Sequence, residues 1–345
     1  MIIAVNATSQ QAFTGGTGRY LHKVLAHVRQ VQTRARFAIL TGQHNHDQFE
    51  GWPRVLVHGG GAVFGGRSAL DAALKRTNAE AVLSPLETAP ARTAVPQVLC
   101  CTELAAWHDQ QGKPRTSGRG RMRAVRKACA NAHGLVVSSE YLKRKCLELF
   151  GAPLDRTLIA PPGTEALFEE AQRPIVEPPY LLVLNDSLTR PWAETVGRVF
   201  REHTGEFPYT MVVAGADPDE SPEAWGPRKV HVERCADTHL AALYQHASLF
   251  LYPALHDGAA LRVLEGLRAG ACVVCPRSGG VPELAGDVPL YYNGASTDSL
   301  VQAVRRALDL EPEQRAERVR LGQGHARHYQ WKQTAWKLLS AFAHL

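Results

Sequence analysis

Two acidic residues, Asp257 and Glu265, stand on either side of the point where a loop is expected to pass into a helix near Ala260. Their separation suits two carboxylates that hold different parts of one ligand: Asp257 a sugar at the loop, and Glu265 two ribose hydroxyls through charge-assisted hydrogen bonds. The helix N-terminus between them would face a diphosphate. The alternative is that Asp257 only caps the helix. Glu265 would then pair with Arg262 or Arg268 on the helix surface.

A glycine-rich stretch, Thr14–Tyr20, lies between the first predicted strand and the first predicted helix and includes Gly15 and Gly16. Such a turn offers backbone N–H groups and the positive end of a helix dipole to an anion. It does not match the dinucleotide-binding fingerprint, because Leu21 stands where the third glycine would be. A turn without a ligand is the alternative.

The elements that must position these residues are short apolar strands that alternate with helical patterns along nearly the whole chain. The strands are too apolar for a one-sided sheet, so we expect two doubly wound parallel sheets covered by helices. The expected strands are Ile2–Val5, Phe37–Leu40, Val55–His58, Ala81–Ser84, Gln97–Cys101 and Leu135–Ser138, then Tyr180–Leu184, Met211–Ala214, Lys229–Val232, Leu249–Tyr252, Cys272–Cys275 and Leu290–Tyr292. Asp237 is expected to cap a helix that includes Leu240 and Leu243.

A proline-rich linker without regular structure is expected at residues 161–179, between the two sets of strands, because prolines at that density exclude helix and strand. We therefore expect an N-terminal Rossmann-like domain at residues 1–165 and a C-terminal one at 166–325. Residues 326–345 follow as a last segment, and the family resemblance described below implies, through Trp331, that they form a helix that crosses back to the first domain. Open α/β sheets bind ligands at the carboxyl ends of their strands, so two such domains would enclose a ligand cleft.

Composition fits a globular protein, because 45% of the 345 residues are hydrophobic and 21% are charged. No apolar run approaches the roughly 20 residues of a membrane-spanning helix, and the start lacks the pattern of a signal peptide, so a cytoplasmic protein is expected. The seven cysteines are expected to be reduced core residues rather than metal ligands. The stretch His44–Asp47 is read as a solvated loop in preference to a metal site.

Basic residues are concentrated between Lys113 and Lys145, a stretch that contains ten Lys or Arg and a single acidic residue, Glu140. The helix expected at Arg119–Ala132 has apolar residues along one stripe and basic residues elsewhere. Its basic side is either solvated or rests on anionic lipid at the inner face of a membrane. Nucleic-acid binding is not expected, since interleaved aromatic residues are missing.

Residues Leu240–Leu300 resemble the donor-binding half of retaining GT-B glycosyltransferases of family 4. The hallmark of that family includes "E-G-F-G-L-P-x-L-E-A-M-A-x-G", and this chain reads Asp257-Gly-Ala-Ala-Leu-Arg-Val-Leu-Glu265-Gly-Leu-Arg-Ala-Gly270. Upstream, Thr14–Tyr20 is similar to the family's "T-G-I-G-R-Y", and Ala160–Phe168 is similar to its "P-N-G-V-D-x-x-F". The resemblance implies a GT-B fold of two Rossmann-like domains that face a central cleft.

This resemblance implies transfer of a sugar, with retention, from a nucleotide-diphosphate donor to a hydroxyl acceptor. The donor would be a UDP- or GDP-sugar, and the acceptor a glycan, a lipid-linked glycan or a small molecule, without a cofactor or metal. Asp257 would lie nearest the sugar, Glu265 would hold the ribose, and Arg190 with Arg262 would stabilise the departing diphosphate. Glu103 takes the place of a catalytic residue in the first domain. The remaining implied site residues are Asn185, Arg234, Gly258, Ala259, Ala260 and Leu261 for the donor, and Gly15 and Gly16 for the cleft.

The chain departs from the family pattern at several of these positions. Pro191 stands at the family's phosphate-binding lysine, and Thr102-Glu103 stands at its His-Asp pair, unless His108-Asp109 serves through a shift of register. Asp257 is one methylene shorter than the usual glutamate, and Ala259-Ala260 replaces Phe-Gly. One alternative is therefore a non-catalytic subunit that scaffolds or activates a partner glycosyltransferase. A sugar-nucleotide epimerase or hydrolase is a weaker alternative.

Overall fold

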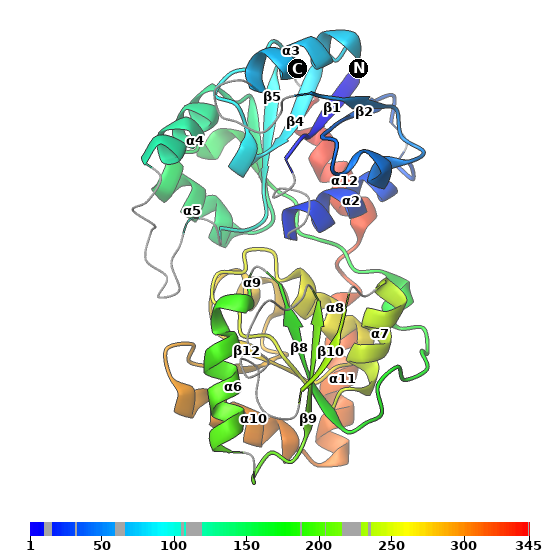
Figure 1. The fold of residues 1–345 in the computed structure, drawn as a ribbon, viewed down its shortest axis with the longest axis vertical. Helices are drawn as coiled ribbons and strands as arrows, with labels where there is room; N and C mark the ends of the chain where they lie inside the picture. The colour runs from blue at the N-terminus through cyan, green and yellow to red at the C-terminus, as the bar shows by residue number, and fades with distance from the viewer. Residues whose placement is uncertain are drawn as a thin grey trace. The chain divides into compact units, whose positions relative to one another are not determined.

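The computed structural model describes residues 1–9, 16–31, 33–58, 66–104, 107, 119–186, 188–203, 205–215, 229–233, 236–343 and 345. The chain divides into two compact units. Unit 1 comprises residues 1–104, 115–161 and 331–345, and unit 2 comprises residues 105–114 and 162–330. Both chain ends therefore belong to unit 1 (Figure 1).

Unit 1 is built on a parallel sheet with the strand order β3-β2-β1-β4-β5-β6-β7. Its strands are β1 (Ile2–Ala7), β2 (Arg36–Thr41), β3 (Arg54–Leu56), β4 (Ala81–Pro85), β5 (Gln97–Cys101), β6 (Gly134–Val137) and β7 (Thr157–Ile159). Its helices are α2 (Gly16–Val28), α3 (Gly66–Arg76), α4 (Arg119–Asn131), α5 (Glu140–Phe150) and α12 (Trp331–Ser340). The central strands are buried on both faces, which is why they consist of near-continuous apolar residues.

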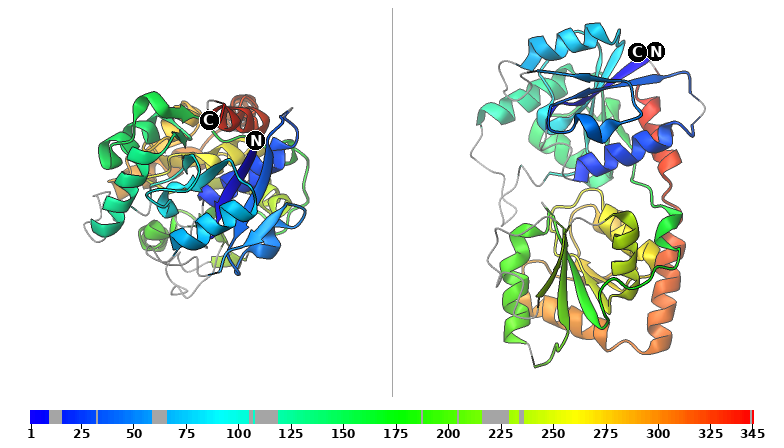
Figure 2. Two further views of the ribbon diagram at one scale, coloured as in Figure 1. Left: turned by 90° about the horizontal axis from the view of Figure 1, so that it is seen from above. Right: turned by 45° about the vertical axis from the view of Figure 1, so that its right-hand side comes forward.

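The C-terminal helix α12 lies beside α2 within unit 1 (Figure 2). The ring of Trp331 meets that of Tyr20 edge-on at 5.6 Å between centroids. The hydroxyl of Thr334 donates a hydrogen bond to the carbonyl of Pro161. The Trp331 ring also stacks on that of His27 at 6.4 Å, so ring contacts and a partly buried hydrogen bond hold α12 to the rest of unit 1.

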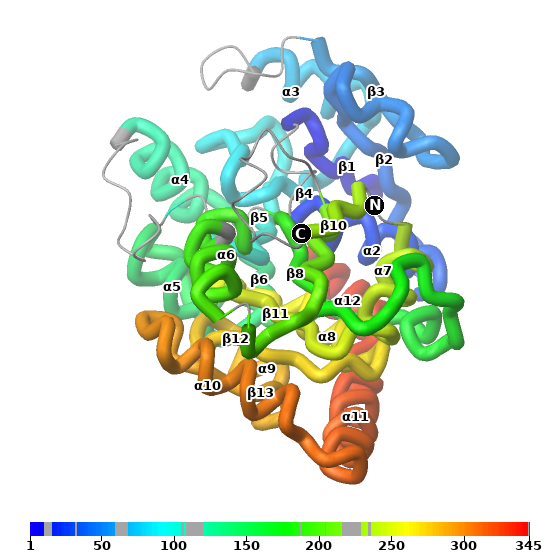
Figure 3. The backbone as a smooth tube through the Cα atoms, turned by 60° about the horizontal axis from the view of Figure 1, so that its bottom comes forward, coloured from blue at the N-terminus to red at the C-terminus, as the bar shows by residue number. Residues whose placement is uncertain are grey.

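Unit 2 is built on a second parallel sheet, with the order β10-β9-β8-β11-β12-β13. Its strands are β8 (Tyr180–Asn185), β9 (Thr210–Gly215), β10 (Lys229–Val232), β11 (Leu249–Leu251), β12 (Val273–Pro276) and β13 (Leu290–Tyr292). Its helices are α6 (Ala193–Glu202), α7 (Asp237–His246), α8 (Leu261–Ala269), α9 (Val281–Ala285), α10 (Thr297–Leu308) and α11 (Pro312–Ala326). The apolar faces of α7, α8 and α9 pack on one side of the sheet and those of α6 and α10 on the other. Helix α11, in orange-red in Figure 3, packs against α8.

The predicted fold class is confirmed, and three details of the expected elements are wrong. Strand β7 was not expected, because it is only three residues long and partly polar. The expected linker contains a turn of 3-10 helix at Ala166–Phe168. Helix α7 begins at Asp237 itself, with Ala236 at the capping position and no side-chain cap, so Asp237 is not the N-cap.

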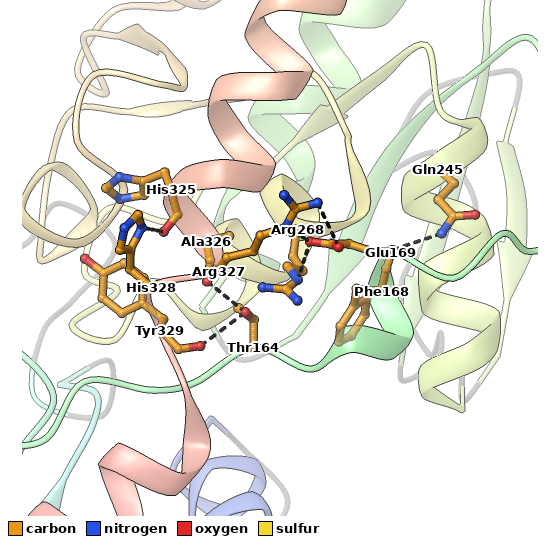
Figure 4. A network of polar contacts seen from close by, with 10 residues as sticks. All are labelled: Thr164, Phe168, Glu169, Gln245, Arg268, His325, Ala326, Arg327, His328 and Tyr329. Carbon is orange, nitrogen blue, oxygen red and sulfur yellow. Dashed lines mark hydrogen bonds and ion pairs between the residues drawn. The ribbon is translucent and has the colours of Figure 1, made fainter.

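The stretch that enters unit 2 is tied to the stretch that leaves it (Figure 4). Thr164 donates its backbone N–H to the carbonyl of Tyr329 over 2.8 Å and its hydroxyl to the carbonyl of Ala326 over 2.9 Å. The carboxylate of Glu169 pairs with Arg327 over 2.7 Å and with Arg268, from the end of α8, over 2.6 Å. Both connections are thus fixed to the body of unit 2 and to the helix that begins near Asp257.

Candidate functional site

The loop before α8 is organised by the side chain of Asp257. Its Oδ1 atom accepts backbone N–H groups from Ala259 over 2.8 Å and from Ala260 over 2.9 Å. The backbone carbonyl of Asp257 accepts the N–H of Gly280 over 2.8 Å, and Asp257 as a whole is only 3% exposed. The backbone N–H groups of Ala259 and Ala260 therefore donate to Asp257 within the loop, although both had been expected to contact a ligand.

Ala260 is the last residue before α8 and has a φ of 50° and a ψ of 21°, which is left-handed backbone. Residues with a side chain rarely take this conformation, because the Cβ atom approaches the following carbonyl. The resemblance places a glycine at this position, and the backbone keeps the shape that glycine favours. Two contacts support this backbone shape. The Asp257 side chain accepts the N–H of Ala260, and Gly279, which also has a positive φ, packs closely against the backbone of Asp257. A Cβ atom on Gly279 would lie 2.4 Å from the carbonyl oxygen of Asp257.

Glu265 lies one turn into α8, is 2% exposed, and accepts a hydrogen bond from Arg262 Nη1 over 3.1 Å. Of the two arginines proposed as its partner, Arg262 fills that role, whereas Arg268 pairs with Glu169. The Arg262 side chain is 25% exposed. Burial alone would lower its pKa, but the neighbouring groups, with Glu265 first among them and Asp186 also contributing, together raise the pKa above its ordinary value. Arg262 is thus a permanent cation at the start of α8.

A third carboxylate, that of Asp186, was not predicted. It directly follows β8, and its Oδ1 atom accepts the N–H groups of Leu188 over 2.9 Å and Thr189 over 3.0 Å. The hydroxyl of Thr189 in turn donates to the carbonyl of Leu184. The charge of Asp186 raises the pKa of Arg262, so the loop after β8 and the start of α8 share one electrostatic environment. The sequence signal was a polar run straight after a buried strand, the usual place for ligand groups.

Burial governs the ionisation of Asp257 and its neighbour Tyr252. Burial raises the pKa of Asp257, the two backbone hydrogen bonds oppose that rise, and the charge of Asp186 adds to it. Tyr252 lies close enough to Asp257 to lower the pKa of that carboxyl slightly. Burial likewise raises the pKa of Tyr252, with Asp257 and Asp186 adding to the effect. The phenol therefore stays protonated.

Arg190 and Asn185 flank Asp186 at the carboxyl end of β8. Asn185 ends the strand and is 4% exposed. Gly215 of β9 passes so close that a Cβ atom there would lie 2.4 Å from the Asn185 carbonyl oxygen. Arg190 donates its backbone N–H to the carbonyl of Asp186 over 2.9 Å, and its side chain is exposed. Pro191 lies in the same 3-10 turn.

In unit 1, the structure brings Gly16 and Glu103 together. A Cβ atom on Gly16 would lie 2.7 Å from Glu103 Oε2, so this carboxylate stands at the first residue of α2. The hydroxyls of Thr17 and Thr102 share a hydrogen bond of 2.8 Å beside it. A carboxylate of the chain itself therefore lies beside the first residue of α2, the helix end for which the sequence left open either an external anion or no ligand.

Some predicted residues lie outside the described part of the chain, namely Gly15, Arg234 and the pair His108-Asp109. Among the described residues, no group of three or more His, Cys, Asp or Glu is arranged to hold a metal ion. His46 is hydrogen-bonded to the Thr41 hydroxyl over 2.7 Å. The six cysteines within the described ranges are free and buried.

Helix α4 has the two-sided character that its sequence predicts. Val125 and Cys129 are buried, whereas Arg123, Arg126 and Lys127 are exposed. Within the described residues, no helix combines the length and the apolar character needed to cross a membrane.

Part of the chain matches a known family. Residues 193–309 match the family described as Glycosyl transferases group 1, a segment that runs from α6 to α10 of unit 2. The D-inositol 3-phosphate glycosyltransferase of Corynebacterium aurimucosum is 24% identical over 249 residues. The alignment covers 62% of this chain and 57% of that relative, so the chain spans little more than half the relative's length.

Solved structures resemble the whole chain. Sucrose-phosphate synthase from Thermosynechococcus elongatus gives a TM-score of 0.77 at 13% identity and covers 100% of this chain and 98% of its own. Anabaena HepE, solved in complex with UDP and glucose, gives a TM-score of 0.75 at 13% identity, with both chains covered completely. At such identities the likeness shows the fold. The chain therefore has the GT-B fold, and together with the family match these findings support a GT-B glycosyltransferase.

Proposed function

We propose that the protein is a retaining glycosyltransferase that takes a sugar from a nucleotide-diphosphate donor, a UDP- or GDP-sugar, and transfers it to a hydroxyl acceptor. The observation that carries the proposal is the ion pair of the buried Glu265 with the partly exposed Arg262 at the start of α8, inside the segment that matches group 1 glycosyl transferases. A carboxylate that is 2% exposed is costly to keep unless it has partners, and a ribose would add two hydroxyl donors to it.

Each named side chain has a proposed role in this donor site. Glu265 accepts hydrogen bonds from the ribose hydroxyls, and Asp257 lies nearest the transferred sugar. Arg262 and the exposed Arg190 carry positive charge toward the departing diphosphate, which gains negative charge in the transition state. Arg262 supplies the cation that Pro191 cannot, since proline stands at the position of the family's lysine. Glu103 is the proposed catalytic residue in unit 1.

A specific observation also favours a second candidate, a non-catalytic relative that binds the donor and supports a partner enzyme. One oxygen of Asp257 is taken by the backbone of Ala259 and Ala260, so this short carboxylate reaches less far than a glutamate would. Release of nucleoside diphosphate in the presence of mixed sugar and polyol acceptors separates the two candidates. Turnover supports the enzyme, whereas donor binding without turnover supports the second candidate.

Hydrogen exchange with mass spectrometry tests where the donor binds. We expect millimolar UDP or GDP to slow amide exchange at residues 257–266 and to leave α11 unchanged. The Glu265→Gln variant should need about tenfold to a hundredfold more nucleotide for the same protection, because it loses the charged acceptor. The matched control is Glu317→Gln, whose carboxylate lies on α11 and pairs with Arg320. Protection that appears elsewhere, or that needs no more nucleotide in Glu265→Gln than in the unmodified protein, would contradict the proposed site.

We also propose, as a separate matter, that the exposed basic side of α4 makes a peripheral contact with an anionic membrane surface where a lipid-linked acceptor is available. Arg123, Arg126 and Lys127 carry this face. Each such cation contributes on the order of 1 kcal/mol near an anionic surface. Sedimentation with vesicles that contain or lack phosphatidylserine, at low and high salt, tests the contact. Equal sedimentation with both kinds of vesicle would contradict it.

A further inference from the structure

The helix that carries Glu265 also carries Arg268, one turn further along, and the side chain of Arg268 is only 13% exposed. In the family pattern that this segment resembles, an alanine stands at the position of Arg268. A buried guanidinium is costly unless a carboxylate balances its charge. Helix α8 therefore carries a cation that needs a partner, three residues after the carboxylate proposed to hold the ribose.

Glu169 is the partner that the structure gives to Arg268 (Figure 4). The Oε1 atom of Glu169 lies 2.6 Å from Arg268 Nε and 2.7 Å from Arg327 Nε, and its Oε2 atom lies 3.0 Å from Arg327 Nη2. Arg327 donates two hydrogen bonds to the carboxylate, whereas the buried Nε atom of Arg268 has no hydrogen-bond acceptor among the described residues. Charge, rather than a directed hydrogen bond from Nε, therefore holds Arg268 to Glu169.

Two positive charges share this single carboxylate. Because both Nε atoms lie within 2.7 Å of Glu169 Oε1, the two guanidinium groups stand close together and repel each other. The side chain of Arg327 is 56% exposed, so water solvates it even without the carboxylate. Arg268 would instead be left buried beside a like charge, which is costly. Without Glu169, Arg268 therefore needs another carboxylate.

Glu265 is the carboxylate that the same helix offers to Arg268. Side chains three residues apart on a helix are neighbours, and the ion pair of Arg262 with Glu265 has this spacing and a distance of 3.1 Å. A glutamate that precedes its basic partner along a helix is also the more favourable order. An arginine that turned to Glu265 from the following turn would take lone pairs of the carboxylate that a ribose also needs.

We propose that Glu169 is a positioning residue of the donor site, which holds Arg268 away from Glu265 and so keeps the Glu265 carboxylate for the ribose hydroxyls. The inference rests on the proposed function. In this role Glu169 acts through Arg268 rather than by contact with the donor. It also accounts for a feature particular to this chain, because the arginine on α8 and the carboxylate that restrains it occur together.

The preference for ribose over 2′-deoxyribose tests the inference, because the 2′-hydroxyl is one of the two groups that Glu265 is proposed to hold. Calorimetric titration with UDP, GDP and their 2′-deoxy forms measures this preference. The unmodified protein should prefer the ribose form of the nucleotide that it binds by about tenfold or more. Glu169→Gln keeps the size of the side chain but removes its charge, and it should lose most of this preference. The double variant Glu169→Gln with Arg268→Gln should regain it, since no arginine is left to compete.

Two further variants complete the set. Arg268→Gln alone should keep the preference, because Glu169 still pairs with Arg327 and the competing arginine is gone. Glu169→Asp keeps the charge but withdraws it by one methylene, so it should lose part of the preference. Circular dichroism checks that each variant is folded, and Glu169→Asp takes the place of Glu169→Gln in the test if the latter does not fold.

The outcomes distinguish this inference from the proposed function. If Glu169→Gln weakens ribose and 2′-deoxyribose nucleotides by the same factor, or weakens neither, the inference is overturned and the donor site stands. A preference that stays lost in the double variant, or that is lost in Arg268→Gln alone, also overturns it. If the unmodified protein binds none of the nucleotides, or binds both forms equally, the proposed role of Glu265 fails, and the inference fails with it.

Discussion

Replacing Ala260 by glycine tests the account of the loop that carries Asp257. The alanine sits at a φ of 50°, where a residue with a side chain pays about 1–2 kcal/mol. Glycine removes that strain. It also loses one buried methyl group, worth about 0.8 kcal/mol, and adds freedom to the unfolded chain that costs about 0.4–1 kcal/mol. The terms nearly cancel, so Ala260→Gly should change the free energy of unfolding by less than about 1 kcal/mol.

The neighbouring Ala259 gives the matched control. It is 8% exposed, it also donates its N–H to Asp257, and its φ is not positive. Ala259→Gly therefore has the same losses without the relief of strain, and it should destabilise unit 2 by about 1–2 kcal/mol. Urea unfolding followed by circular dichroism at 25 °C measures both variants. Equal destabilisation by the two substitutions would refute the idea that Ala260 holds a strained left-handed conformation.

Three further substitutions test other parts of the structure by the same unfolding measurement. Gly279→Ala should cost more than about 2 kcal/mol, because its φ is +65° and its Cβ atom would lie 2.4 Å from the Asp257 carbonyl; a neutral result would contradict the close approach. Gly324→Ala, in open space on α11, should instead stabilise by about 0.5–1 kcal/mol, and a loss would show that the site is more crowded than described. Burial raises the pKa of Glu87 from 4.5 to about 7, so the folded form binds more protons between those values and loses stability as pH rises through that window. The free energy of unfolding of Glu87→Gln should therefore rise relative to that of the unmodified protein between pH 5 and pH 8. A difference between the two proteins that stays constant over this range would argue against a buried carboxyl at this position.

The fold could be predicted because each strand is an apolar run long enough to be buried on both faces. Strand β7 escaped prediction because three residues that begin with a threonine do not stand out from a loop. Its place in the sheet depends on pairing with β6, and this pairing is a tertiary contact that no local pattern records. The same reason accounts for helix ends that differ from expectation by one residue.

The candidate site could be predicted in part. The spacing of Asp257 and Glu265 reflects one continuous loop and helix, so the sequence pattern reveals it. The conformation in which Asp257 bonds to its own loop is held by backbone contacts with Gly279 and Gly280, which lie more than twenty residues further along the chain. Asp186 joins the site only because β8 lies next to β11 in the sheet. The order of strands in the sheet brings these residues together, and a local sequence pattern does not reveal that order.

The pairing of Gly16 with Glu103 shows the same limit in unit 1. Each residue was predicted to belong to a site, and the glycine loop was interpreted either as facing an external anion or as a turn without a ligand. The structure instead sets a carboxylate of the chain against the first turn of α2. A helix terminus is a good anion site whether the anion comes from a ligand or from the protein.

The most direct test of the central claim, a nucleotide-sugar site at the start of α8, is calorimetric titration of the protein with UDP, GDP, ADP and dTDP and with their sugar conjugates. We expect selective binding near micromolar, about −8 kcal/mol. Glu265→Gln should weaken it by about tenfold to a hundredfold, since a hydrogen bond to a charged group contributes about 1.5–3 kcal/mol. Glu317→Gln should leave it unchanged. Absence of binding to every nucleotide at millimolar concentration, or undiminished binding by Glu265→Gln, would contradict the claim.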